Sequence, residues 1–111
     1  MKVIKPSVEI MDVFDGMDVI RKLELCGRVC YKSEGKMNEV SSFKFIQNII
    51  NRGHESVLEH FSFSVKFICD RGISHEIVRH RIASYSQEST RYCNYSKDDF
   101  GSEITVIEPC F

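Results

Sequence analysis

Phe61-Ser62-Phe63-Ser64-Val65-Lys66-Phe67 alternates strictly between apolar and polar side chains. Successive side chains on a β-strand point to opposite faces, so a period of two predicts a strand with one aromatic and one polar face. We expect the aromatic face to lie in the core. The face that carries Ser62, Ser64 and Lys66 is expected to be wetter. This strand is the clearest element that the sequence predicts.

Two helices are expected before this strand. Apolar side chains at approximately helical spacing predict the first helix over residues 17–30. Ser41 or Ser42 is expected to cap the second helix, which carries an apolar face. Gly53 directly follows Arg52 and is typical of a helix stop, because glycine adopts the left-handed conformation that ends helices.

Shorter elements are expected before the first of these helices and after the strand. Residues 2–13 alternate loosely around Pro6, which predicts one edge strand or two short ones. Ser74 is expected to cap a helix over residues 75–81. Residues 104–107 are expected to form a last strand, after a turn. Together these elements predict an α+β fold, with a mixed β-sheet packed with helices.

The composition is that of an ordinary globular chain. Its 111 residues, 42% hydrophobic and 28% charged, fit one modest domain over residues 1–111. A formal net charge of -1 gives no support for nucleic-acid binding or for an anionic membrane surface. No apolar run is long enough to span a bilayer. We therefore expect neither nucleic acid nor a membrane as a partner.

The cysteines predict no disulfide framework and no zinc ribbon, because their number is odd and they form no CxxC pair. They stand at positions 26, 30, 69, 93 and 110. Cys26 and Cys30 lie four apart on the first predicted helix, and we expect them to act as small buried hydrophobes. Reduced thiols suit the cytoplasm, which is the expected location.

Cationic donors are concentrated in the stretch Arg79–Arg91. It carries three arginines, one histidine and four serine or threonine side chains within thirteen residues. The guanidinium fork suits phosphate or carboxylate oxygens, and hydroxyl groups add short neutral donors. We expect the arginines at its start to lie in the last turn of the helix over residues 75–81. The stretch predicts an anion site, with a solvated helix end and polar loop as the alternative.

Metal binding is not expected. His75 and His80 are five residues apart, whereas the two histidines of a zinc-binding HExxH helix share one face at a spacing of four. His54 and His60, each next to a glutamate, match no established ligand spacing, and a structural role is the simpler interpretation.

The sequence identifies no catalytic nucleophile, so the catalytic residues are unknown. Cys93 is the only thiol close to the basic stretch, and a packing role is the simpler interpretation for it. The serines at 84, 86 and 89 lack the GxSxG surroundings of a serine hydrolase. We expect them to donate hydrogen bonds to an anion or to the backbone.

Three motifs resemble those of one known family. Arg79-His80-Arg81, followed after seven residues by Ser89, resembles the RHRx7S signature of flavin-dependent thymidylate synthases, the ThyX family. His54–His60 is similar to the family's H-x-S/T-x-x-E-H segment. Gly27–Tyr31 resembles a third family segment. Their order and spacing make the resemblance much more specific than one motif alone, and it implies the fold of a thymidylate-synthase-complementing protein.

The resemblance implies a reaction and its ligands. Members of the family convert dUMP to dTMP with FAD as cofactor, methylene-tetrahydrofolate as carbon donor and NADPH as reductant. No covalent enzyme cysteine takes part, which weakens a catalytic role for Cys93. The family works as a homotetramer whose sites are shared between subunits.

The resemblance also implies roles for individual residues. The expected FAD contacts are Ser56, Glu59, Arg79, His80 and Arg81. The expected dUMP contacts are Glu76, Arg79, Gln87, Glu88, Ser89 and Arg91. Arg91 and Ser89 are expected on the phosphate side. For Glu59, a hydrogen bond to ribityl hydroxyls and an ion pair with an arginine of the later stretch both remain open.

Two features depart from the family pattern. Glu76 occupies a position where members often have glutamine, and an acid is less favourable beside an anion. The resemblance also covers only about the N-terminal half of the family's sequence, so we expect the 111-residue chain to be weak or inactive alone. The alternative is a non-catalytic nucleotide- or flavin-binding module, and a third possibility is a plain structural fragment.

Overall fold

The computed structural model describes residues 1–109, which form two compact units. The first unit combines residues 1–9 with the chain from residue 66 onward, and the second consists of residues 10–65. The expectation of one domain over residues 1–111 stays a prediction, because this division does not test whether the units unfold together. Among the described residues no helix is long and apolar enough to cross a membrane.

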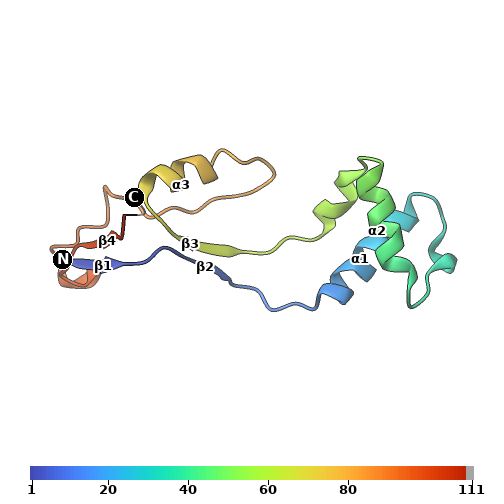
Figure 1. The fold of residues 1–111 in the computed structure, drawn as a ribbon, viewed down its shortest axis with the longest axis horizontal. Helices are drawn as coiled ribbons and strands as arrows, with labels where there is room; N and C mark the ends of the chain where they lie inside the picture. The colour runs from blue at the N-terminus through green and yellow to red at the C-terminus, as the bar shows by residue number, and fades with distance from the viewer. Residues whose placement is uncertain (110–111) are drawn as a thin grey trace. The chain divides into compact units, whose positions relative to one another are not determined.

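The first unit contains the two ends of the described chain as a parallel strand pair. Strand β1 (Lys2–Ile4) lies beside β4 (Thr105–Ile107), with Val3 opposite Val106 (Figure 1). The backbone pairing continues beyond β4, where the Glu108 amide donates to the Ile4 carbonyl at 2.8 Å. The strand expected at residues 104–107 is therefore confirmed.

A second two-stranded sheet pairs β2 (Ser7–Ile10) with β3 (Val65–Ile68), and these two strands run in opposite directions (Figure 1). Pro6 lies in the break between β1 and β2, where its missing amide costs no ladder hydrogen bond. Two short strands in the first residues were one of the predicted outcomes. Because helices accompany parallel and antiparallel strand pairs, the α+β prediction is confirmed.

The strand predicted over residues 61–67 is shorter and shifted: β3 begins only at Val65. One more backbone bond follows, from the Met11 amide to the Ser64 carbonyl at 2.9 Å, but the Ser64 amide donates to the Asp12 carboxylate at 2.5 Å instead of to a backbone carbonyl. Phe63 and Phe67 are 49% and 50% exposed, so the prediction that the aromatic face is buried is wrong for these two rings. Phe63 nevertheless packs against other rings, with its centroid 5.5 Å from that of Phe14 and 5.9 Å from that of Phe61.

Helix α3 (Arg71–Ile77) starts and ends earlier than the sequence predicted. Its N-cap is Asp70, whose carboxylate accepts the Ile73 amide at 3.0 Å, and not Ser74, which lies inside the helix. An aspartate carboxylate and a serine hydroxyl are comparable caps, and here the earlier one is used. As a consequence Arg79–Arg81 follow the helix, so their placement in its last turn is wrong.

The second unit is helical. Helix α1 (Gly16–Val29) confirms the helix predicted over residues 17–30 and begins at Asp15, whose carboxylate accepts the Met17 and Asp18 amides at 2.8 and 3.1 Å. A short 3-10 turn, η1 (Glu34–Lys36), lies in the connection that follows.

Helix α2 (Ser41–Asn51) confirms the second predicted helix but not its cap. The N-cap is Val40, whose apolar side chain cannot accept a hydrogen bond, and the Ser42 hydroxyl donates at 2.6 Å to Glu24 of α1. The predicted stop is confirmed: Gly53 has a φ of +68°, and its amide donates to the Ile50 carbonyl at 3.0 Å. This left-handed glycine turns the chain into a second 3-10 segment, η2 (Glu55–His60).

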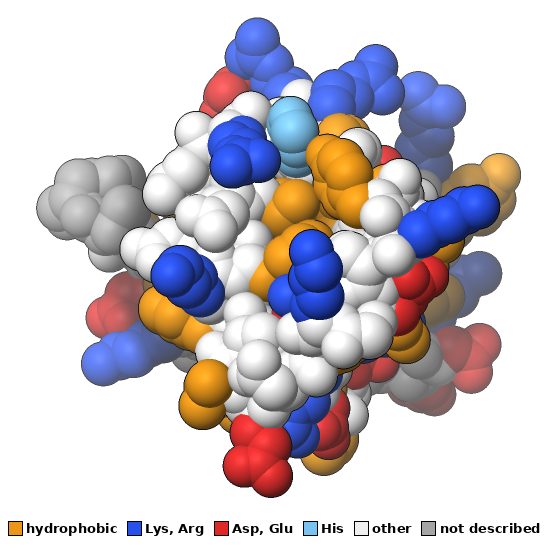
Figure 2. Space-filling model, turned by 90° about the vertical axis from the view of Figure 1, so that its right-hand side faces the viewer, with side chains coloured by type: hydrophobic (Ala, Val, Ile, Leu, Met, Phe, Trp, Pro, Cys, Tyr) orange, Lys and Arg blue, Asp and Glu red, His pale blue; other side chains and the backbone are white. Residues whose placement is uncertain are grey.

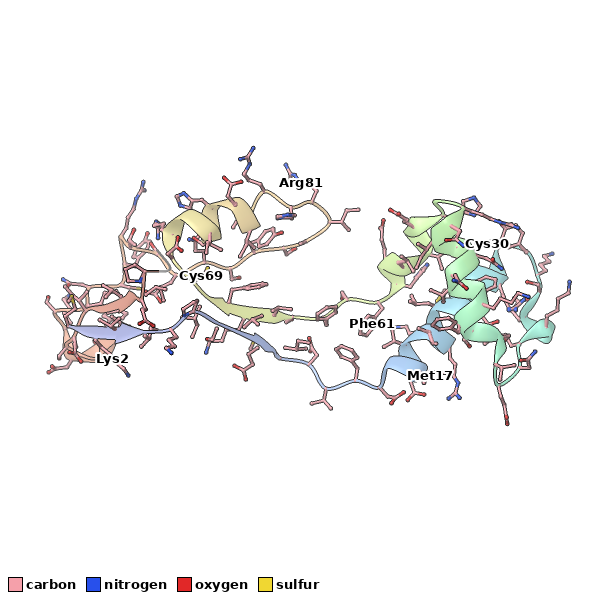
Figure 3. All side chains as sticks on the ribbon, in the orientation of Figure 1. Lys2, Met17, Cys30, Phe61, Cys69 and Arg81 are labelled. Carbon is pink, nitrogen blue, oxygen red and sulfur yellow. The ribbon has the colours of Figure 1, made fainter. Side chains whose placement is uncertain are left out.

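The buried centre of the described chain lies between α1 and α2. Its buried apolar side chains are Leu23, Ile46 and Ile49, each at most 9% exposed. Elsewhere on this unit hydrophobic side chains reach the surface between separated Lys and Arg side chains (Figure 2). Cys26 is half-buried, but Cys30 is exposed at the end of α1 (Figure 3), so the prediction that both thiols are buried is wrong for Cys30. Cys110 lies outside the described residues.

A buried carboxylate accompanies this small core. Glu24 is fully buried and accepts the Arg28 Nε at 2.7 Å, the Ser42 hydroxyl at 2.6 Å and the Ser41 hydroxyl at 3.0 Å. Burial acts to raise the pKa of Glu24, but the hydrogen bonds from Ser42, Ser41 and Arg28 and the charge of Arg28 outweigh it. The net pKa is lowered from the ordinary value of 4.5.

The lowered pKa of Glu24 predicts that the stability of the helical unit falls at acid pH. Since the folded-state pKa of Glu24 is depressed, its stabilisation is fully present above pH 4.5 and is lost as the pH falls through the folded pKa. Urea unfolding of the wild type, followed by circular dichroism between about pH 3 and pH 7, should therefore show a falling midpoint on the acid side. Glu24→Gln should flatten that slope. If the urea midpoint changes equally with pH in both proteins, the pH dependence does not arise from Glu24.

Candidate functional site

The stretch Arg79–Arg91 forms an exposed loop of the first unit, directly after α3. Its backbone turns at Ile82, which has a φ of +60° and is 82% exposed. A β-branched residue in the left-handed region is strained and persists only where its surroundings hold it. Arg81, the residue before this turn, lies in the loop beyond the end of α3 (Figure 3).

Two side-chain hydrogen bonds fold this loop back toward α3. The Tyr85 hydroxyl donates to the His80 carbonyl at 2.8 Å, across the Ile82 turn. The Gln87 amide nitrogen donates to the Ser74 hydroxyl at 2.8 Å, which connects the far side of the loop to the helix. The first bond closes the turn within the loop, and the second connects the later half of the loop to α3.

Arg79 is paired within the site. Its Nη1 atom lies 3.2 Å from the Glu76 carboxylate, one helical turn earlier, and the two side chains are 74% and 71% exposed. An exposed pair of this kind contributes little to stability, so an incoming anion can compete for the guanidinium. The Glu76 carboxylate thus offsets one of the positive charges of the stretch.

Other donors of the stretch are free. Among residues 1–109, the guanidinium groups of Arg81 and Arg91 form no hydrogen bond or ion pair with another residue. Ser89 is half-buried, and its hydroxyl oxygen accepts the Arg91 amide at 3.3 Å. An open cavity of about 370 Å³ lies beside Arg91 and is lined by Thr90, Arg91, Cys93, Asn94, Tyr95, Ser96 and Ile104.

The other candidate segment, His54–His60, belongs to the helical unit. Its 3-10 turns point Val57 and Leu58 inward, where they are half-buried, and leave Ser56 and Glu59 exposed. The segment starts where Gly53 redirects the chain after α2. Its polar side chains are therefore presented outward from a packed support.

The structure brings some of the predicted site residues together. All expected dUMP contacts lie in the first unit, on α3 or in the loop after it. The expected FAD contacts are divided, with Ser56 and Glu59 in the helical unit and Arg79, His80 and Arg81 in the first. Within residues 1–109 no three His, Cys, Asp or Glu side chains are arranged to hold a metal ion. The ligand assignments themselves stay predictions.

The sequence did not predict the supporting roles of Glu24 and Tyr85. Arg28 was noticed only as part of a family segment, and the role of Glu24 as its buried partner was not predicted. The available signal was their spacing of four on a helix, which places a carboxylate and a guanidinium on the same face. Tyr85 was also missed, since nothing in its neighbours indicates a bond to a carbonyl five residues earlier.

Comparison with known families agrees with this arrangement of motifs. The sequence model of the family described as thymidylate synthase complementing protein matches residues 12–111. The chain belongs to this family. The match includes α1, the His54–His60 segment and the whole Arg79–Arg91 stretch of this thymidylate synthase complementing protein homologue.

Curated relatives carry the name flavin-dependent thymidylate synthase. One from Geobacter sulfurreducens is 44% identical over 84 residues, which cover 68% of this chain and 36% of the relative. One from Mycolicibacterium gilvum is 41% identical over 90 residues, or 78% of this chain and 35% of the relative. One from Pyrococcus furiosus is 48% identical over 75 residues, which cover 66% of this chain and 30% of the relative.

This member of the thymidylate synthase complementing protein family spans about a third of the length of the curated relatives it matches. No solved structure matches the chain. Family membership is therefore established by sequence, while activity, substrates and partners of the whole protein are matters for proposal.

Proposed function

We propose that this chain contributes part of the site of a flavin-dependent thymidylate synthase, which converts dUMP to dTMP. The observation that carries the proposal is the exposed Arg79–Arg91 loop, in which the guanidiniums of Arg81 and Arg91 have no partner among residues 1–109 and the Ser89 hydroxyl is half-buried. A nucleotide monophosphate requires such charge-assisted donors. The names of the relatives supply the reaction class.

In this proposal the later half of the loop holds the nucleotide. Arg91 and Ser89 donate to the phosphate, and Gln87 and Glu88 approach the rest of dUMP. Arg79 exchanges its exposed pairing with Glu76 for the anion, at little cost because both side chains are already solvated.

The donors that are present fit a flavin, because an anionic, electron-rich cofactor is favoured by cations and neutral donors. The proposed flavin contacts are Arg79, His80 and Arg81 in the first unit, and the exposed hydroxyl of Ser56 and carboxylate of Glu59 in the helical unit. When bound and reduced, the flavin would supply the hydride that passes to the pyrimidine. The protein side chains bind and orient the two ligands and exclude competing reactions.

The remaining parts of the reaction extend the same proposal. Methylene-tetrahydrofolate is the proposed carbon donor, NADPH the reductant, a homotetramer the assembly and the cytoplasm the location. Since the chain spans about a third of its relatives' length, residues beyond those that it carries take part in the complete reaction.

A turnover assay tests the activity of the 111-residue chain. With FAD, methylene-tetrahydrofolate and dUMP present, we expect NADPH oxidation that depends on dUMP to be near background, because the chain covers so little of the relatives. The measurement is the loss of absorbance at the NADPH band, with and without dUMP, together with chromatographic detection of dTMP. Robust turnover by the purified chain would contradict the expected inactivity and support a complete site.

The alternative is a non-catalytic nucleotide- or flavin-binding module. It is favoured by the exposure of the candidate donors, which lack the closed surroundings that exclude water from a reaction. Flavin absorbance that stays with the purified chain, without dTMP formation, would support this alternative. Absence of flavin binding and of any thermal shift with dUMP would argue for a plain structural fragment.

A further inference from the structure

The segment Gly27–Tyr31 is a family motif to which neither the nucleotide nor the flavin proposal gives a role. It lies at the end of α1, where Arg28 is largely buried, with 11% of its side chain exposed. A buried arginine is expensive unless its donors are used. Here Nε and Nη2 both lie 2.7 Å from Oε1 of the fully buried Glu24, and Nη1 donates to the Ser33 carbonyl at 3.4 Å.

The guanidinium plane that is fixed in this way supports an aromatic ring. The centre of the Arg28 guanidinium lies 4.8 Å from the centroid of the Phe45 ring, in a cation–π contact between α1 and α2. Because Glu24 and the Ser33 carbonyl together engage all three guanidinium nitrogens, the guanidinium plane has little freedom to rotate. The position of Phe45 is thereby coupled to a buried ion pair.

The same ring lies against the point where the proposed flavin segment, His54–His60, meets α1. A Cβ atom on Gly27 would be 2.7 Å from Cε1 of Phe45 and 3.2 Å from Cγ1 of Val57. Phe45 and Val57 therefore both pack on the bare backbone of Gly27. Val57 is the inward-facing neighbour of Ser56 in η2, so this contact fixes the support from which Ser56 and Glu59 project.

We propose that Arg28 is a positioning residue for the flavin segment. Held by Glu24 and stacked on Phe45, it fixes η2 against the bare backbone of Gly27. It touches no ligand, and it acts on flavin binding only through Phe45 and Val57. This inference rests on the proposed flavin site for its functional consequence, whereas the coupling of Arg28 to η2 is a property of the fold alone.

The test compares Arg28→Lys with the wild-type chain. Lysine keeps the positive charge beside Glu24 but loses the planar fork and most of the stacking on Phe45. The matched control is Arg21→Lys, which makes the same change on the same helix at a site where the arginine is 51% exposed. Ile49→Val is the second control, because it removes one buried methylene from the core and leaves the Arg28 and Phe45 side chains themselves unchanged.

Two readouts separate positioning from general destabilisation. In FAD and dUMP titrations at a temperature where every variant is folded, Arg28→Lys should weaken FAD binding at least fivefold and leave dUMP binding within twofold. Arg21→Lys and Ile49→Val should leave both affinities within twofold. Equal FAD affinity in Arg28→Lys and wild type, or equal weakening in Ile49→Val, would overturn the proposal.

Hydrogen exchange provides the readout that needs no ligand. The Phe61 amide donates to the Leu58 carbonyl at 3.2 Å and so reports the closure of η2. Its exchange should be at least fivefold faster in Arg28→Lys, and unchanged in Arg21→Lys. If the wild type binds no FAD, the proposed flavin site fails, and the exchange rates alone decide whether Arg28 positions η2. Unchanged exchange in Arg28→Lys would then overturn it.

Discussion

Arg28→Ala is expected to lower the free energy of unfolding of the helical unit by about 3–5 kcal/mol, because it removes one partner of a buried ion pair. The carboxylate of Glu24 would stay fully buried, with Ser41 and Ser42 as its remaining donors and no positive charge beside it. The same change removes the stacking contact on Phe45. Urea unfolding followed by circular dichroism measures the loss.

Arg21→Ala is the matched control for this prediction. Arg21 also lies on α1 and pairs with an acid one turn earlier, but its Nη1 is 3.5 Å from Asp18 and both side chains are more than half exposed. Exposed pairs of this kind contribute about 0–1 kcal/mol. Similar losses in the two variants would show that burial of the Arg28 pair has no special energetic weight.

Arg91→Ala is expected to weaken dUMP binding by about 1.5–3 kcal/mol, the contribution of a hydrogen bond to a charged group. This corresponds to a rise in Kd of roughly tenfold to 150-fold. The guanidinium of Arg91 has no partner within the described chain, so its removal leaves no buried group unpaired and should not change stability. Calorimetric titration with dUMP measures the affinity, and thermal unfolding without ligand measures the stability.

Arg71→Ala provides the charge-matched comparison for Arg91. It removes the same charge from the same unit, at the first residue of α3 and outside the predicted nucleotide contacts. Only a small loss of affinity is expected from the change in net charge. If both variants weaken dUMP equally, or neither does, Arg91 is a solvated arginine and not a phosphate ligand.

The elements of this fold could be predicted from sequence where local signals are strong. Helical spacing located α1 and α2, and the glycine at position 53 located the end of α2. The class of the fold followed from the same patterns. These features depend on residues close together in the chain, which is why they can be read without tertiary information.

The errors arose where two local signals competed or where a distant residue intervened. Asp70 and Ser74 are both good caps, and sequence alone does not decide between them. The alternating strand was shortened by Asp12, a residue 52 positions from the Ser64 amide that it accepts. Alternation shows which side chains share a face but not how much of that face is covered, so it overestimated the burial of Phe63 and Phe67, which are about half exposed.

The candidate site shows the same division. Its motif residues were identifiable because arginine forks and hydroxyls are concentrated in one stretch. The bond from Tyr85 to the His80 carbonyl and the stacking of Arg28 on Phe45 were not predictable, since both depend on the backbone path between their partners. The sequence therefore indicates which side chains can bind a ligand, whereas the contacts that hold those side chains in place are seen only in the structure.

The division of the chain has a consequence for the order of folding during synthesis. The helical unit is continuous from residue 10 to residue 65, and its contacts become available as soon as that stretch has left the ribosome. The first unit is discontinuous, because β1 must wait for β4 to be made before Val3 can pair with Val106. Strand β1 precedes the other described elements in the chain, yet it is among the last of them to acquire its partner.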